Sequence, residues 1–225
     1  MKRDLAALVR LLQLASPALP VGAYSYSQGL EAAVEAGLVK DGESAGRWIG
    51  EVLELSVASL EAPLLARLLE AFAAGDRAAA SRWNDEFLAS RESAELRAES
   101  VQMGYSLRRL AKELDLPGAA GLEAFEEVSF PAAFAAVAAG WSIPREEAVA
   151  AYLWAWAENQ VMAALKAVPL GQTDGQRVLL SLGARLPAAA RAALSAQDGD
   201  LANFAPGLAI LSSRHETQYS RLFRS

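Results

Sequence analysis

The chain has 225 residues, of which 53% are hydrophobic, and a formal net charge of −6. It contains no cysteine, which excludes disulfides, zinc knuckles and thiol catalysis. The acidic balance, without a strong basic run, argues against a nucleic-acid partner. No window approaches the roughly 18 uninterrupted apolar residues that suggest a membrane span, and the N-terminal residues lack the pattern of a signal peptide. We therefore expect a cytoplasmic protein that contacts neither membrane nor nucleic acid.

The N-terminal third is predicted to be helical, with breaks at proline and glycine. The segment 5–15 has one apolar stripe, made of Leu5, Leu8, Leu12 and Ala15. Two prolines and a glycine in residues 16–26 end this helix. Ser25 or Ser27 is a candidate cap for the next helix. A long helical pattern follows over residues 43–72, and we expect Pro63 to divide or kink it.

The middle of the chain continues the helical pattern. Gly75 and Asp76 form a stop followed by a cap for another helix, and residues 95–114 form a further amphipathic helix. A short helix is expected after Pro131. The longest predicted helix starts near Pro144 and runs to about Val168. Its apolar side chains are too many for one stripe, which predicts a central helix packed on several sides.

Helices also account for the rest of the chain. Thr173 and Gln176 fit a capping box, in which each side chain bonds a free backbone N–H. Pro187 is expected to interrupt the helix that follows, and Pro206 to open the last one. Few stretches alternate in the manner of strands. The sequence thus predicts an all-α fold: residues 1–225 form one domain, a bundle of roughly ten helices around a central apolar helix.

Catalytic and cofactor motifs are scarce. No Gly-Lys pair occurs, so a phosphate-binding loop of the usual kind is excluded. With one histidine and no thiol, a tight transition-metal site within one chain is not expected, and His215 is only a weak candidate ligand, more simply read as a packing or hydrogen-bonding residue. A small hydrolase could use His215 as a base for Ser212, Ser213 or Ser220, but no nucleophile-elbow pattern surrounds them. We therefore expect a non-enzymatic protein without a cofactor.

The C-terminal residues 213–225 form the most unusual segment. They hold the only histidine and end in two large apolar side chains, Leu222 and Phe223, between Arg221 and Arg224. Such a segment either packs on its own domain or docks on a partner. Because the rest of the chain predicts a complete helical domain with its own central helix, we interpret residues 213–225 as a docking tail.

Other candidates for partner contact are aromatic. Tyr24 and Tyr26 lie in the proline-rich loop, where they either fix the loop to the core or form a contact patch. Trp154 lies on a second face of the central helix, as a dimer contact would, although core packing is the simpler reading. Lys166 ends that helix, where a cation complements the helix dipole.

Three separated motifs together resemble the urease accessory protein family UreF. They are the run from Leu14 to Glu31 (LASPALPVGAYSYSQGLE), the run from Lys166 to Gln172 (KAVPLGQ), and the tail with His215-Glu216 and Arg221 to Ser225. Arg91-Glu92 and Glu95-Leu96-Arg97 between them fit as well. Ala23 departs from the pattern, since many members have a glycine there. The match covers almost the whole chain in the right order.

The resemblance implies an all-α homodimer that acts as a chaperone in nickel insertion. Its partners would be the UreD/UreH scaffold, the GTPase UreG and apo-urease, with the tail docking on UreD/UreH and the dimer surface receiving UreG. The alternative is a regulator of GTP hydrolysis by UreG, with Arg221 or Arg224 supplied in trans. The residues expected at partner contacts are Tyr24, Tyr26, Glu31, Lys166, His215, Tyr219, Arg221, Leu222, Phe223 and Arg224.

Overall fold

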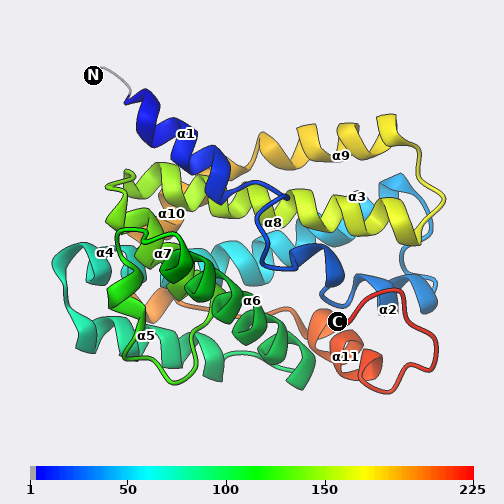
Figure 1. Cartoon of the computed structure of the whole chain (residues 1–225). Helices are drawn as coiled ribbons and strands as arrows, with labels where there is room; N and C mark the ends of the chain where they lie inside the picture. Colours follow the sequence, from blue (N-terminus) through cyan, green and yellow to red (C-terminus); the bar gives the residue numbers. More distant parts are fainter. Residues whose placement is uncertain (1–3) are drawn as a thin grey trace.

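The computed structural model describes residues 4–225, and within that range the regular elements are helices (Figure 1). The α-helices are α1 (Leu5–Leu14), α2 (Leu30–Glu35), α3 (Gly42–Val52), α4 (Ala62–Ala74), α5 (Arg77–Ala89), α6 (Ala94–Glu113), α7 (Phe130–Gly140), α8 (Arg145–Ala167), α9 (Gln172–Gly183), α10 (Leu186–Ser195) and α11 (Pro206–His215). The shorter elements are the 3₁₀ helices η1 (Ala23–Ser25), η3 (Ala119–Leu122) and η4 (Asp198–Asp200) and the π-helix η2 (Leu53–Glu61). The predicted all-α fold class is confirmed.

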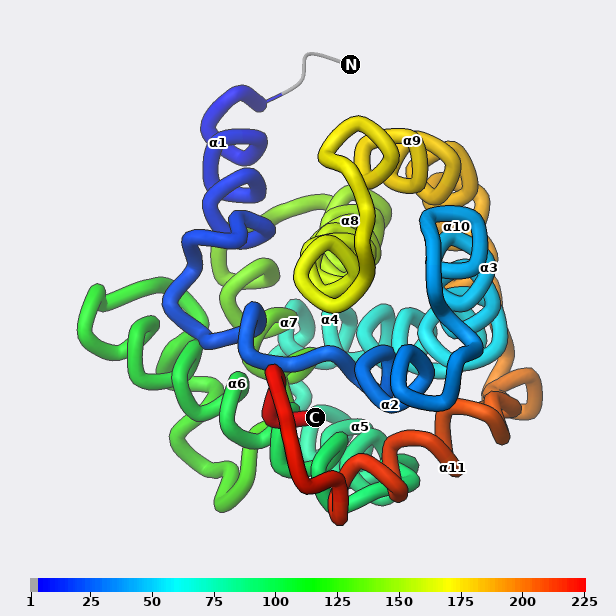
Figure 2. Tube along the Cα trace, turned by 90° about the vertical axis from the view of Figure 1, so that its right-hand side faces the viewer, coloured from blue at the N-terminus to red at the C-terminus, as the bar shows by residue number. Residues whose placement is uncertain are grey.

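Helix α8 is the centre of the arrangement, as its sequence predicts. Figure 2 shows it end-on, with other helices around it, and it packs against α2, α3, α4, α9 and α10. Its buried side chains lie on several faces and include Val149, Leu153, Trp156 and Val161. A helix that is apolar around most of its circumference is stable only when neighbours cover it on those sides.

Helix α7 is the second buried helix. Its residues from Pro131 to Val137 are all buried, and it packs against α4 and α6. The segment that leads into α7 lies close against α6, because a Cβ atom added at Gly104 would lie 2.1 Å from the carbonyl oxygen of Val128. This packing fixes α6, which carries Glu95 and Glu99.

The predicted helix over residues 43–72 is observed as one helical path, and its centre is the π-helix η2. Pro63 has no N–H, and its ring excludes the carbonyl four residues earlier from an α-helical bond. That carbonyl, on Ser59, instead accepts a hydrogen bond from Ala202 N at 3.2 Å, and Leu55 O accepts one from Phe204 N at 3.0 Å. The wider turn thus joins two helices without a break and ends at Glu61.

Two local predictions are wrong. The stripe predicted for the first helix faces outward: Leu5, Leu8 and Leu12 are exposed, and the adjacent stripe of Ala7, Leu11 and Leu14 is buried. Both stripes have helical spacing, so periodicity alone could not choose between them. Thr173 is not a cap, because α9 begins at Gln172 with Gly171 as its N-cap residue.

Several predicted breaks are confirmed. Asp76 caps α5 by accepting from Ala79 N, and Pro187 lies in the first turn of α10, after a break at Ala184 and Arg185. Pro206 opens α11. None of the helices among residues 4–225 is both long and apolar enough to cross a membrane.

Candidate functional site

The C-terminal residues fold back onto the loop that precedes α2. Figure 2 shows this red segment, here called the strap (residues 218–225), reaching the blue loop. The carbonyl oxygen of Ser225 accepts from Ser27 N at 2.7 Å and from Ser27 Oγ at 2.5 Å, and Arg224 N donates to Ser25 O at 2.8 Å. The Ser27 hydroxyl also accepts from Glu31 N at the start of α2. One serine therefore joins the strap to the beginning of a helix.

Glu31 is the main acceptor for the strap. Its buried carboxylate accepts backbone N–H groups from Leu222 at 2.7 Å and Phe223 at 2.9 Å, and the side chain of Gln218 at 3.3 Å. Hydrogen bonds to a charged acceptor are stronger than those between neutral groups. Glu31, which the family motif places at a partner contact, here holds the chain's own C-terminal segment.

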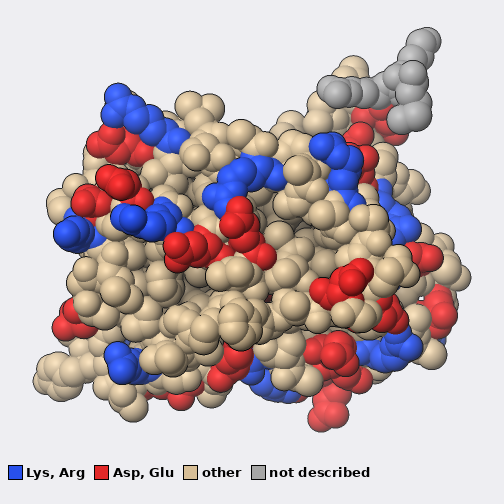
Figure 3. Space-filling view, turned by 180° about the vertical axis from the view of Figure 1, so that it is seen from behind, with Lys and Arg blue, Asp and Glu red and all other residues tan. Residues whose placement is uncertain are grey.

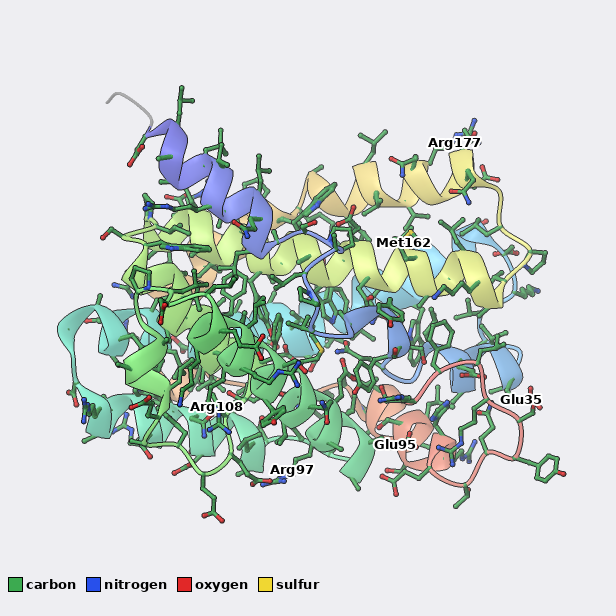
Figure 4. The ribbon with its side chains drawn as sticks, in the orientation of Figure 1. Glu35, Glu95, Arg97, Arg108, Met162 and Arg177 are labelled. Carbon is green, nitrogen blue, oxygen red and sulfur yellow. The ribbon has the colours of Figure 1, made fainter. Side chains whose placement is uncertain are left out.

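His215, the last residue of α11, lies between two carboxylates and has no exposed surface. Its Nδ1 is 2.6 Å from Glu95 Oε2, and its Nε2 is 3.2 Å from Glu31 Oε2. The second oxygen of Glu95 accepts from Arg221 Nη1 at 2.6 Å. Figure 4 labels Glu95 where α6 meets α11. The cluster ties α2, α6, α11 and the strap together.

This geometry argues against two uses of His215. Both ring nitrogens face carboxylate oxygens, so neither is free to take a proton from a serine, and the Ser212 hydroxyl donates to its own helix at Ala209 O. Within residues 4–225 no group of three or more His, Asp or Glu side chains is placed to hold a metal ion. The contacts of His215 thus hold the C-terminal segment against α2 and α6.

The aromatic residues of the predicted set and Leu222 divide between core and surface. Phe223 and Tyr26 are buried, whereas Tyr24, Tyr219 and Leu222 are exposed. The ammonium group of Lys166 lies 5.5 Å from the centre of the Phe223 ring and 5.7 Å from that of Tyr24, within range of a cation–π contact. Burial raises the pKa of Tyr26, and hydrogen bonding to Arg224 partly lowers it.

The strap is therefore more deeply packed than the sequence suggests. We expected the domain to be complete without it, but Phe223 and Ser225 belong to the buried interior. This burial depends on hydrogen bonds, because a chain end can be buried only when its backbone N–H and C=O groups have partners. Glu31 and Ser27 supply those partners, and both lie more than 180 residues earlier in the chain.

A second polar cluster lies beneath the strap and was not predicted. Arg91 Nη1 bonds Glu61 Oε1 at 2.5 Å, and the Tyr152 hydroxyl donates to Glu61 Oε2 at 3.1 Å. Burial, followed by the nearby charge of Glu61, raises the pKa of Tyr152. Glu61 lies at helical spacing from the buried residues Val57, Leu64 and Leu65, and this spacing could have indicated a buried carboxylate.

Glu99 links this cluster to the strap. One carboxylate oxygen accepts from Gln28 Nε2 at 2.7 Å and the other from Ser225 Oγ at 2.8 Å. Gln28 in turn accepts from Trp156 Nε1 at 2.6 Å, and its backbone has a φ of 52°, which few residues other than glycine adopt. Burial raises the pKa of Glu99 from 4.5 to about 7.

A cavity of about 150 Å³ reaches these groups from the surface. Its walls include the loop from Leu14 to Tyr24 and the exposed side of α8 at Met162 and Lys166, and Glu61 and Glu99 are among its polar lining residues. Figure 4 labels Met162 on α8. The opening of the cavity thus lies next to an exposed apolar side of the molecule.

That apolar side is formed by α1, α8 and α9. Its exposed side chains are Leu5, Leu8, Val9, Leu12, Trp154, Met162 and Leu180. Trp154 is 39% exposed and lies at the packed edge of α9, since a Cβ atom at Gly183 would be 3.4 Å from its ring. By contrast, basic and acidic side chains are interspersed on the face shown in Figure 3. The three helices are neighbours, since α8 packs against both α1 and α9, and exposed apolar side chains gathered on neighbouring helices are typical of interaction sites.

Comparison with known proteins agrees with these features. The sequence model of the UreF family matches residues 39–183. The chain belongs to the UreF family. The urease accessory protein UreF of Azoarcus sp. (strain BH72) is 63% identical over 223 residues, which cover 97% of this chain and 95% of that protein. The corresponding protein of Dechloromonas aromatica (strain RCB) is 58% identical, with 97% of each chain covered.

A third UreF relative has a different organisation. The bifunctional urease accessory protein UreEF of Bordetella bronchiseptica is 53% identical over 228 residues, which cover 99% of this chain but 53% of that protein. This chain therefore aligns with about half of that bifunctional protein. The predicted membership of the UreF family is confirmed.

Proposed function

We propose that this UreF-family chain is a non-enzymatic adaptor that assists nickel insertion into apo-urease. In this role it bridges the UreD/UreH scaffold and the GTPase UreG on apo-urease. The observation that carries the proposal is the strap, which is fixed from below by Glu31 and Phe223 and presents Tyr219 and Leu222 to solvent. A surface preorganised in this way favours protein binding, because little ordering is required on association.

We place UreD/UreH at the strap. While the strap is packed, only its outward-facing side chains are available for contact. Of its two large apolar side chains, Leu222 is exposed and Phe223 is buried. Tyr and Arg often dominate binding energy at interfaces, and Tyr219 and the exposed Arg224 are of these types. Phe223 and Glu31 then act as positioning residues beneath the contact surface.

We also propose a homodimer through the apolar side of α1, α8 and α9. Self-association by two-fold symmetry buries the same patch on both copies, and Trp154 would lie within it. The dimer would present one continuous surface to UreG, with Lys166 at the edge of the cavity opening. Lys166 is exposed, in contrast to Glu31, so Lys166 is the residue that can touch a partner directly.

The structure gives less support to the alternative, a regulator that supplies an arginine to UreG. The Arg221 guanidinium already donates to Glu95 Oε1, Gln218 O and Glu216 O, at 2.6 to 2.9 Å. A trans arginine would first have to break these three bonds. Arg224 lies beside Tyr26 and is the better candidate for this alternative.

Reconstitution from purified components tests the proposed function. Apo-urease is incubated with nickel, bicarbonate, UreD/UreH, UreG and GTP, with and without this chain, and urease activity and GTP turnover are both measured. We expect urease activity to appear only when this chain is present. The rate of GTP hydrolysis by UreG should be nearly the same with and without the chain. Equal urease activation without the chain would contradict the adaptor, and acceleration of GTP turnover by about 10³-fold or more would favour the regulator.

A further inference from the structure

The turn that leads into α2 has an unusual backbone. Gln28 and Gly29 follow each other with φ values of 52° and 78°, and Leu30 N donates to Ser27 O at 3.2 Å across them. Two successive left-handed residues closed by such a bond are typical of a type I′ turn, whose central positions are usually glycine, asparagine or aspartate. Gly29 fits this preference and Gln28 does not, so other contacts have to hold Gln28 in its conformation.

The side chain of Gln28 supplies these contacts through both ends of its amide. Its Nε2 donates to Glu99 Oε1 on α6 at 2.7 Å. Its Oε1 accepts from Trp156 Nε1 at 2.6 Å and from Gln160 Nε2 at 3.4 Å, both on α8. One side chain therefore joins the turn to two helices of the body. A strained residue persists when several contacts converge on it, and such residues gather at functional sites.

The other side of the turn lies against α11. A Cβ atom added at Gly29 would lie 3.0 Å from Leu208 Cδ1 and 3.6 Å from Ser212 N. Glycine is thus required at this position both for its φ and for the close approach. The turn is held between α11 on one side and, through Gln28, α6 and α8 on the other.

The groups that receive the strap lie on either side of Gln28 in the chain. Ser25 and Ser27 precede it and bond the last two residues of the strap. Glu31 follows it and accepts two further backbone N–H groups of the strap. Because the turn separates these two sets, its conformation determines how far apart they lie and at what angle they face the strap.

We propose that Gln28 is the positioning residue for the outward face of the strap. By tying the turn to α6 and α8, it holds Ser27 and Glu31 at the separation that the strap requires, and it thereby fixes Tyr219 and Leu222 for contact with a partner. This inference rests on the binding role proposed above for the strap. A strap attached to a loose turn would have to be ordered on association, and that ordering weakens binding.

Glutamine suits this position because the site needs a donor and an acceptor at the end of one side chain of this length. The donor faces Glu99, and the acceptor faces Trp156. Glutamate has the same length and lacks the donor, whereas glycine has neither group and removes the backbone strain. Substitutions to glutamate and to glycine therefore separate the side-chain contacts from the backbone conformation.

Hydrogen exchange of the Leu222 and Phe223 amides in Gln28→Gly tests the proposal in the full chain. Glycine adopts a φ of 52° without strain, so a side chain without a positioning role would leave the protection of these amides unchanged or higher. We expect their protection to fall about tenfold or more relative to that of the α5 amides. The matched control is Asp115→Gly, which relieves a φ of 49° at an exposed residue after the other end of α6 and should keep full protection. Unchanged protection in Gln28→Gly would overturn the proposal.

Exchange of the two partners tests the contact itself and remains decisive if Gln28→Gly does not fold. At about pH 8, Gln28→Glu places two carboxylates against each other, and strap protection should fall about tenfold or more. In the double variant Gln28→Glu/Glu99→Gln the new amide at position 99 can donate to the new carboxylate at position 28 and still accept from the Ser225 hydroxyl. We expect protection to return to within about threefold of that of the unmodified chain. Absence of this recovery would contradict the proposal.

The affinity for UreD/UreH, measured by calorimetry, links Gln28 to binding. We expect Gln28→Gly to bind about tenfold more weakly and Asp115→Gly to bind as the unmodified chain does. Lost strap protection with undiminished affinity would refute the positioning role. If the unmodified chain itself does not bind UreD/UreH, the proposed function fails, and the strap amides alone then decide whether Gln28 holds the strap.

Discussion

The two ends of the described chain meet the body of the molecule in opposite ways. Helix α1 is rich in leucine, yet it exposes Leu5, Leu8 and Leu12 to solvent. The strap is mostly polar, yet Phe223 and Ser225 are buried, and its backbone bonds Glu31, Ser25 and Ser27. Apolar composition therefore does not decide which end is packed. Acceptors and donors placed to receive the backbone of an irregular segment decide it, whereas a helix satisfies its own backbone and can present an apolar face outward.

Among the variants considered, removal of the Glu31 carboxylate should weaken the packing of the strap most. In Glu31→Ala two backbone N–H groups of the strap and the Gln218 amide lose an acceptor, and the contact with His215 Nε2 is also lost. Each buried donor without a partner costs about 1–3 kcal/mol, so we expect a loss of about 4 kcal/mol in the free energy of unfolding. The loss is not larger, because the strap can detach and its N–H groups can then bond to water. Urea denaturation measures this loss.

The matched control for Glu31 is Glu35→Ala, on the same helix. Glu35 is exposed (labelled in Figure 4), and its removal should change stability by about 0.5 kcal/mol or less. Equal stability of Glu31→Ala and Glu35→Ala would show that the carboxylate of Glu31 is not what packs the strap.

The pH dependence of stability should be the next largest effect. Because the folded chain holds the Glu99 proton to about pH 7 and the unfolded chain only to 4.5, this group makes the protein less stable as pH rises through that range. The difference corresponds to about 3 kcal/mol. The free energy of unfolding of Glu99→Gln, measured by urea denaturation, should rise by about this much relative to that of the unmodified chain between pH 4.5 and 8. A constant difference between the two proteins over that range would contradict the assignment.

Helix α1 should show the smallest effect on the folded monomer. The double variant Leu8→Asp/Leu12→Asp places charges on the exposed stripe, so we expect a change of about 0.5 kcal/mol or less in monomer stability. If this stripe forms the proposed dimer contact, light scattering should show a dimer for the unmodified chain and a monomer for the double variant. A dimer in both would exclude α1 from the interface.

The helices could be predicted because their apolar periodicity is local in the sequence. The central position of α8 follows from apolar residues on several of its faces, and the breaks at Asp76, Pro187 and Pro206 follow from local capping and proline chemistry. The buried face of α1 could not be chosen, since two leucine-containing stripes have the same spacing. The π-helix depends on Pro63 together with a segment some 140 residues later, which pairs with its free carbonyl groups.

The candidate site could be predicted only in part, because its contacts join segments that are far apart in the sequence. Family motifs identified Glu31, Lys166 and the tail, but no local pattern indicates that Glu31 receives the backbone of Leu222 and Phe223 from the other end of the chain. Glu99 and Gln28 were missed because each is an ordinary polar residue in its own segment. Their roles arise from burial and from partners on other elements.

The central claim is that the outward face of the strap binds UreD/UreH, and isothermal titration calorimetry with Leu222→Asp tests it most directly. Leu222 is 70% exposed, so this variant should keep its helicity and stability and lose about 100-fold or more in affinity for UreD/UreH, as expected for a residue at the centre of an interface. Leu114→Asp, an exposed leucine at the C-terminal end of α6, is the matched control and should bind as the unmodified chain does. Undiminished binding by Leu222→Asp would contradict the account.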